Sequence, residues 1–135
     1  MGNQGSRLVA YNVIYDYRGF YQPVDNTPTL NVVKAGSAVP VKFSLGGDQG
    51  LDIFAKAADG SSYPKTAPIA CNSTDSVDAI EETVSASTSA LHYDASTNHY
   101  VYNWKTEKAW AGTCLQLVLK FKDGTKHLAN FRLTK

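Results

Sequence analysis

The sequence predicts an all-β protein, an antiparallel β-sandwich of immunoglobulin-like type, from three observations. Apolar and polar side chains alternate with a period of two along most of the chain. Gly, Pro, Asn and Asp fall between the alternating segments at the short intervals typical of a sandwich. The chain has 135 residues, of which 43% are hydrophobic, and this is enough for one domain with its own core.

Ten segments have the alternation expected of strands. They are Leu8–Tyr17, Leu30–Lys34, Ala38–Leu45, Leu51–Ala55, Ile69–Cys71, Ile80–Ser85, Ala90–Tyr93, His99–Trp104, Leu115–Phe121 and Lys126–Leu133. Helical spacing is conceivable only in the short stretch 77–83. Residues 1–7 lack the charged start and apolar stretch of a signal peptide, so we expect a leader or linker there and a single domain over residues 8–135.

The segment Ala38–Leu45 can be given an inner and an outer face, because successive side chains of a strand point to opposite sides. The inward residues are Val39, Val41, Phe43 and Leu45, and the outward residues are Pro40, Lys42 and Ser44. Pro40 has no N–H to donate, which places this strand at a sheet edge or at a bulge.

The segments Ala90–Tyr93 and His99–Trp104 predict a hairpin with a four-residue loop, residues 95–98. This loop length puts the large apolar side chains on one face, whereas a five-residue loop splits them between both faces. The inward residues are then Leu91, Tyr93, Tyr100, Tyr102 and Trp104, and the outward ones are His92, His99 and Asn103.

The last two segments predict a hairpin closed by a three-residue loop, residues 122–124. The residues predicted to share one face all have odd numbers, so pairing them requires a loop with an odd number of residues, with Gly124 in a left-handed bulge. They are Leu115, Leu117, Leu119, Phe121, His127, Ala129, Phe131 and Leu133.

Cys71 and Cys114 are the only two cysteines, and neither lies in a zinc-binding spacing. The alternatives are two free thiols or one disulfide, and we favour the disulfide, whose loop of about 43 residues is worth roughly 4 kcal/mol on the chain-entropy model. The parity of Cys114 is opposite to that of the buried leucines, so we expect the bond at a strand start and not between the sheet centres. Disulfides persist in oxidising compartments, which predicts an extracellular protein.

Several longer motifs together resemble one family. They are YDYRGFYQPVD (residues 15–25), NVVKAGSAVPVKFSLGGDQGL (31–51), WKTEKAWAGTC (104–114) and DGT (123–125). This pattern is similar to that of the PxKF domain, named for an element that is present here as Pro40, Lys42 and Phe43. The resemblance covers nearly the whole chain from Tyr11 onward and is weakest over residues 57–68. It implies a domain of bacterial secreted or cell-surface proteins, usually near the C-terminus of chains with hydrolase or adhesive modules.

The sequence contains no motif that predicts catalysis, so we expect a protein that is not an enzyme and has no cofactor. A formal charge of +1 argues against nucleic acid as a partner, and no apolar run approaches the roughly 18 residues of a membrane-spanning helix. Asp48 and Asp52 are weak calcium candidates, since Asp in loops is more often a turn former. His92 and His99 lack a third metal ligand nearby, so no metal site is predicted.

Five aromatic residues crowd the first strand and the turn after it, more than one inward face can bury. They are Tyr11, Tyr15, Tyr17, Phe20 and Tyr21. Exposed rings of this kind stack on sugars or fill a partner's pocket. The alternative is that they cover the open end of the sandwich.

We therefore expect a non-catalytic accessory module of a larger extracellular protein, a spacer or attachment domain whose partners are its neighbouring domains. The alternative is a carbohydrate- or cell-wall-binding module that uses the N-terminal aromatic residues. A third hypothesis is a stalk domain locked by a Lys to Asn/Asp isopeptide bond. As an isolated domain the chain is expected to be a monomer.

Overall fold

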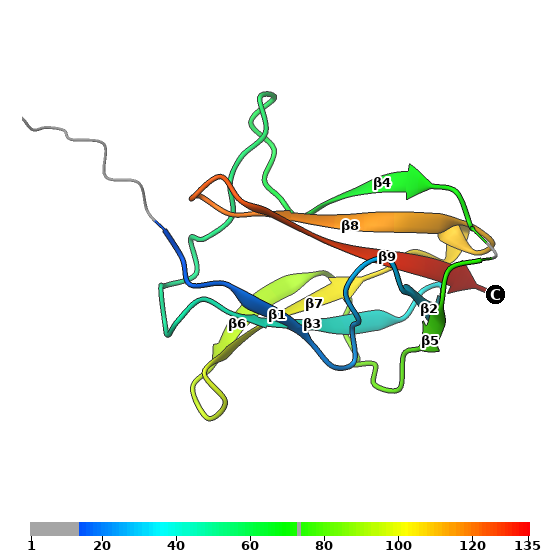
Figure 1. Cartoon of the computed structure of the whole chain (residues 1–135), viewed down its shortest axis with the longest axis horizontal. Helices are drawn as coiled ribbons and strands as arrows, with labels where there is room; N and C mark the ends of the chain where they lie inside the picture. Colours follow the sequence, from blue (N-terminus) through cyan, green and yellow to red (C-terminus); the bar gives the residue numbers. More distant parts are fainter. Residues whose placement is uncertain (1–13, 73) are drawn as a thin grey trace, which may run out of the picture.

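The computed structural model describes residues 14–72 and 74–135, which form two β-sheets packed face to face (Figure 1). One sheet has the strand order β1-β3-β7-β6, and the other has the order β4-β8-β9-β2-β5. The strands are β1 (Arg18–Tyr21), β2 (Leu30–Lys34), β3 (Ala38–Ser44), β4 (Lys65–Ile69), β5 (Val77–Ala79), β6 (Ala90–Asp94), β7 (His99–Lys105), β8 (Cys114–Lys120) and β9 (Lys126–Thr134). A short 3-10 helix, η2 (Lys108–Trp110), follows β7. The predicted all-β sandwich is confirmed.

The five-stranded sheet is mixed and not wholly antiparallel as predicted. β2 runs parallel to both of its neighbours, β5 and β9, whereas the other ladders are antiparallel. Residues 22–29 carry the chain from β1 in one sheet to β2 in the other. Because no tight hairpin fixes the direction of β2, it is free to run parallel to its neighbours.

The core lies between β3 and β7 of one sheet and β8 and β9 of the other. The residues predicted to point inward from the segment 38–45 are at most 1% exposed, which confirms the assigned face. They pack in one cluster with Leu117, Leu119, Phe131 and Leu133 of the opposite sheet. On the outer face of β3, the ammonium group of Lys42 lies 3.1 Å from Glu82 Oε1.

Pro40 is buried, which corrects the prediction that it faces solvent. Strand β1 pairs only with residues 42–44 of β3, so Pro40 lies in the half of β3 that β1 does not cover. The segment after β5 covers this region instead, since Val84 bridges to Ala38 and Glu82 reaches Lys42. Around Pro40, strand β3 thus has the free edge that was predicted, but the segment after β5 covers this edge.

Both predicted hairpins have the expected register. Asp94 pairs with His99 across the loop 95–98. In the last hairpin, the backbone N–H of Phe121 donates to the carbonyl of Thr125 at 3.0 Å, which leaves residues 122–124 as the loop. Gly124 has φ +87°, the left-handed conformation predicted for it.

The first predicted strand is displaced along the chain. Residues 8–13 lie outside the described part, residues 14–17 form no strand, and β1 begins at Arg18. Gly19 explains the position of β1, because a Cβ there would lie 3.0 Å from Phe43 Cβ and 3.1 Å from the Tyr17 hydroxyl. Only glycine allows this close approach at a φ of +151°.

Three further predictions in the middle of the chain are wrong in position. The segment 51–55 contributes only the single bridge between Phe54 and Phe121. Strand β4 begins at Lys65, four residues before the predicted start at Ile69. Strand β5 begins at Val77, three residues before the predicted start at Ile80. The stretch considered for a helix, residues 77–83, begins with β5.

Cys71 and Cys114 form a disulfide, with their Cα atoms 5.4 Å apart. Cys114 is the first residue of β8, and it pairs in the ladder with Ile69, the last residue of β4. The bond therefore holds the end of the edge strand β4 to β8 within one sheet, as predicted, and does not join the two sheets.

The first described residues and the C-terminus lie at opposite ends of the longest axis (Figure 1). At one end, the backbone N–H of Tyr15 donates to Asp123 Oδ2 at 3.2 Å, next to the turn that precedes β9. At the other end, the N–H of Ala35 donates to the carbonyl of Thr134, the last residue of β9. Strand β9 has 9 residues, so it separates these contacts by roughly 30 Å.

Candidate functional site

The five aromatic residues predicted to form one surface do not lie together on one face of the molecule. Phe20 points inward and is 8% exposed, so the expectation that it belongs to a binding surface is wrong. Tyr15 and Tyr17 are half-buried and pack against the core cluster. Tyr21 has the opposite parity to Phe20 and lies on the outer face of the sheet, while Tyr11 falls outside the described residues.

Tyr17 closes the end of the sandwich. Its ring stacks on His127 with centroids 3.5 Å apart and on Phe43 with centroids 6.1 Å apart. Burial raises the pKa of the Tyr17 phenol well above its usual value, and the hydroxyl has no hydrogen-bond partner within the described residues. Burial also lowers the pKa of His127, and the nearby charge of Asp123 opposes this shift. These contacts make Tyr17 a covering residue of the core.

Tyr15 has a similar role at the same end. Its ring meets Phe121 edge to face at 6.1 Å, and its backbone is tied to Asp123. The alternative expectation, that these aromatic residues cover the open end of the sandwich, therefore describes both Tyr15 and Tyr17.

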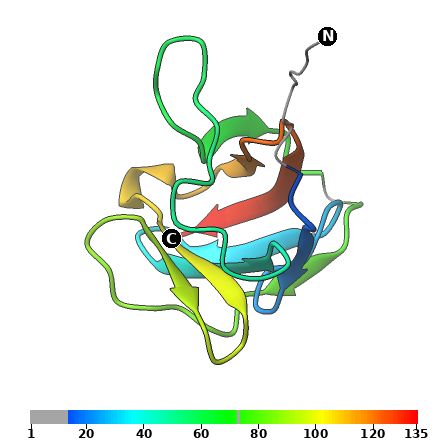
Figure 2. The same ribbon diagram turned by 90° about the vertical axis from the view of Figure 1, so that its left-hand side faces the viewer.

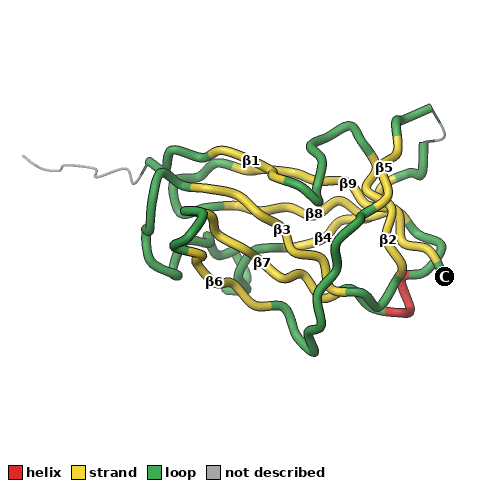
Figure 3. The backbone as a smooth tube through the Cα atoms, turned by 90° about the horizontal axis from the view of Figure 1, so that it is seen from below, coloured by secondary structure: helices red, strands yellow, loops and turns green. Residues whose placement is uncertain are grey.

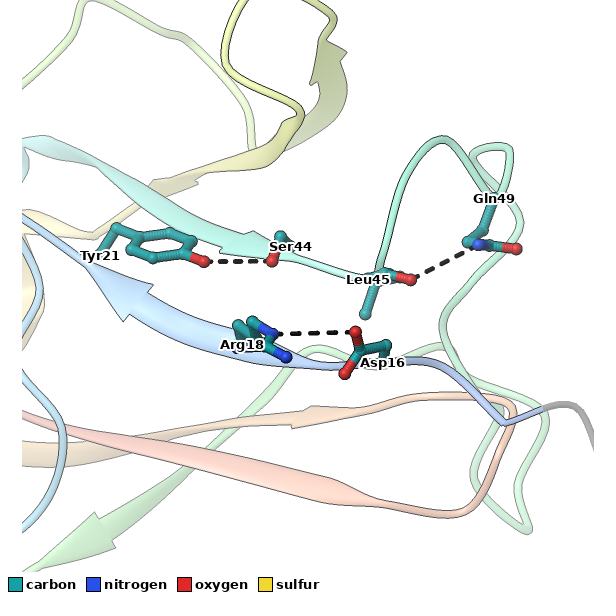
Figure 4. Close-up of polar contacts among 6 residues, drawn as sticks. All are labelled: Asp16, Arg18, Tyr21, Ser44, Leu45 and Gln49. Atoms are coloured by element: carbon teal, nitrogen blue, oxygen red, sulfur yellow. Dashed lines mark hydrogen bonds and ion pairs between the residues drawn. The ribbon is translucent and has the colours of Figure 1, made fainter.

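Tyr21, from the predicted set, borders an open hollow. Its ring stacks on His99 with centroids 4.0 Å apart and planes 7° apart. Its hydroxyl lies 3.1 Å from Ser44 Oγ on the neighbouring strand β3 (Figure 4). We call this hollow, of about 430 Å³, the Tyr21 hollow; it is lined by Tyr21, Ser44, Gly46, Gly47, Thr97, Asn98 and His99.

The end of β3 shapes this hollow. Gly46 and Gly47 have φ of +79° and +116°, a conformation that turns the chain away from β1 directly after the strand. Gln49 Nε2 reaches back to the carbonyl of Leu45 at 3.4 Å, and Arg18 pairs with Asp16 on the other side (Figure 4). The hollow offers one stacked ring pair, hydroxyls and an amide, which suit weak binding of a polar molecule.

The predicted calcium candidates have other roles. The carboxylate of Asp48 accepts a hydrogen bond from the backbone N–H of Gly50 at 2.9 Å, as in an Asx turn. Asp52 pairs with the ammonium group of Lys122 at 2.5 Å. Within residues 14–72 and 74–135, no group of three or more His, Cys, Asp or Glu side chains is arranged to hold a metal ion.

The three histidines occupy separate environments. His92 is exposed on β6, His99 stacks on Tyr21, and His127 stacks on Tyr17 at the end of the sandwich. Asn31, the buried asparagine of the described chain, satisfies its amide with the backbone of Asp25 and Asn130.

Comparison of the chain with models of protein families, with curated proteins and with solved structures found no match. The resemblance to the PxKF domain rests on the motifs quoted above. Among the described residues, no helix has the length and apolar character needed to cross a membrane.

One hollow was missed by the sequence analysis. It lies beside Tyr102, Trp104 and Trp110, of which the first two were assigned to the core and the third to no role. The available signal was that both tryptophans of the chain fall within the seven residues 104–110.

Proposed function

We propose that this chain is a non-catalytic accessory module of a larger extracellular protein, and that it acts as a spacer that holds its neighbours apart. The observation that carries the proposal is the placement of the first described residues and the C-terminus at opposite ends of the sandwich (Figure 1). Domains attached at these ends face away from each other, with the length of β9 between them.

Two further features support a rigid spacer. Both ends are hydrogen-bonded to the body of the sandwich, through Tyr15 with Asp123 and through Ala35 with Thr134. The disulfide closes the edge strand β4 onto β8, and such bonds persist outside the cell. The resemblance to the PxKF domain, a module of bacterial secreted or surface proteins, points to the same setting.

The proposal is tested by fusing one small globular reporter domain to each end of the chain and measuring solution X-ray scattering. The matched control replaces the chain by a Gly/Ser linker of about 30 residues, whose r.m.s. span is also roughly 30 Å. We expect two resolved peaks in the pair-distance distribution of the fusion and one broad distribution for the control. Indistinguishable curves would refute the spacer role.

A further inference from the structure

A second hollow lies at the open side of the sandwich, between the edge strand β4 and strand β7. We call it the Trp110 groove; it has a volume of about 470 Å³ and its lining includes Thr66, Ser89, Tyr102, Trp104, Glu107 and Trp110. Helix η2, which carries Trp110, lies near the end of the molecule that holds the C-terminus (Figure 3). Strands β4 and β7 belong to different sheets, and the view along the long axis shows these two sheets as separate layers (Figure 2).

The aromatic rings of this groove are held in place by the core. Trp110 lies against the buried Trp104 with ring centroids 6.0 Å apart, and Trp104 in turn packs on Phe131 at 4.7 Å. Tyr102 meets Phe54 edge to face at 5.8 Å. Trp110 and Tyr102 are both half-buried, so each presents part of a fixed ring to the groove. A ligand stacking there would not have to order these side chains.

The groove carries charged side chains of both signs, Lys65, Lys105 and Glu107, and hydroxyl groups can accept from the ammonium groups and donate to the carboxylate. The ammonium groups of Lys65 and Lys105 also line the groove; they donate to Ser61 Oγ and to the carbonyl of Gly36, and each keeps further N–H donors. Glu107 is exposed, and none of the ion pairs among the described residues includes it. The groove thus offers ammonium donors, a carboxylate acceptor and the hydroxyls of Thr66 and Ser89 beside its rings. Ser89 Oγ accepts a hydrogen bond from the backbone N–H of Lys105 at 2.9 Å, so its O–H stays free to donate.

We propose that the Trp110 groove binds a neutral oligosaccharide. The C–H face of a sugar ring stacks on Trp110 or Tyr102, and the sugar hydroxyls exchange hydrogen bonds with Glu107, Thr66 and Ser89. A proline-rich peptide also docks on aromatic grooves, but it offers few donors to a carboxylate, because proline residues have no backbone N–H. This proposal goes beyond the spacer role and does not depend on it.

The two tryptophans of the chain both line the groove, so intrinsic fluorescence reports on its occupancy. The probes are cellohexaose, xylohexaose, mannohexaose and chitohexaose, with decaproline as the competing ligand class. We expect at least one oligosaccharide to shift the emission and to give a saturating titration. Affinities of the variants are measured by calorimetry, because Trp110→Ala removes one of the two optical reporters.

Trp110→Ala is expected to weaken binding by at least about tenfold, as a central aromatic contact does. Glu107→Ala, at an exposed position, is expected to weaken it with an unchanged melting temperature, which keeps the test valid if Trp110→Ala unfolds. Tyr21→Ala, in the separate Tyr21 hollow, is the control that retains affinity. No binding of any oligosaccharide at millimolar concentration, unchanged affinity in both groove variants, or binding of decaproline alone would overturn the proposal. None of these outcomes would affect the scattering test of the spacer.

Discussion

Phe43 and Lys42 are adjacent in β3 but belong to opposite faces of the sheet. Phe43 is fully buried among Tyr100, Phe121 and Tyr17, whereas the Lys42 side chain is 27% exposed and pairs with Glu82. Phe43→Ala should lower the free energy of unfolding by about 3 to 5 kcal/mol. Lys42→Ala should lower it by under about 1 kcal/mol, the usual range for an exposed ion pair. Urea denaturation of both variants checks this, and equal losses would mean that the faces are wrongly assigned.

Asp78 on β5 provides a test of pH dependence at a single residue. A hydrogen bond with Asp25 raises the pKa of Asp78 from 3.8 to about 6, and desolvation and the nearby charges of Asp25 and Glu81 add to the rise. Because the pKa is higher in the folded state, the contribution of Asp78 to stability is complete below pH 3.8 and is lost as the pH rises through about 6.

Asp78→Asn removes this titration and keeps a similar shape. We expect the variant and the parent chain to melt at similar temperatures near pH 4, and the variant to melt at the higher temperature at pH 7. Thermal denaturation across this range by circular dichroism provides the measurement. A difference in melting temperature that stays constant with pH would show that Asp25 and Asp78 are not coupled.

Among the secondary-structure elements, the disulfide connects the edge strand β4 of the five-stranded sheet to its neighbour β8. Strand β4 is an edge strand with mostly exposed or half-exposed residues, and it pairs only with β8. The double variant Cys71→Ser/Cys114→Ser should lose about 4 kcal/mol on the chain-entropy model. Hydrogen exchange should accelerate first in β4, with β3 and β7 least affected.

Thiol titration under denaturant provides the matching check on the parent chain. Protein produced in an oxidising compartment is expected to contain no free thiol. Two reactive thiols in such material would contradict both the bond and the physical argument for an extracellular location.

Strands with one buried face were predictable from the sequence, and strands without one were not. The segments of β2, β3, β6, β7, β8 and β9 were predicted to within one residue at each end, because burial of one face imposes the period of two. In β5, by contrast, Val77 is 57% exposed, so its apolar side chain marks no core position. Strand β4 contains Pro68, a residue that argues against a strand in the sequence but is tolerated at a sheet edge.

The same reasoning explains what was missed about the candidate sites. The predicted aromatic surface depended on residues 15–17 being in a strand, which can bury only alternate side chains. Tyr15 and Tyr17 instead precede β1 and fold over the end of the core. The Trp110 groove combines β4, β7 and η2, which are separate in sequence. The period of two assigns a side chain to one face of a strand. Only the packing of the two sheets shows which of the inward aromatic rings stay partly exposed at the open side of the sandwich.

In the molecule as a whole, the spacer role requires one rigid body with separated ends. The core cluster draws on both sheets, including β3 and β7 on one side and β8 and β9 on the other. Ile14 precedes Tyr15, whose backbone N–H donates to Asp123 before the start of β9, and Lys135 follows Thr134, the last residue of β9. A bend or a hinge between the sheets would have to break this shared core.

The most direct test is the distance between spin labels at residues 14 and 135, measured by pulsed electron paramagnetic resonance. The labels are attached through non-natural amino acids, so that Cys71 and Cys114 stay paired. We predict a single narrow distribution centred at or above about 30 Å, the length of a nine-residue strand. A broad distribution, or one centred well below this distance, would contradict a rigid spacer.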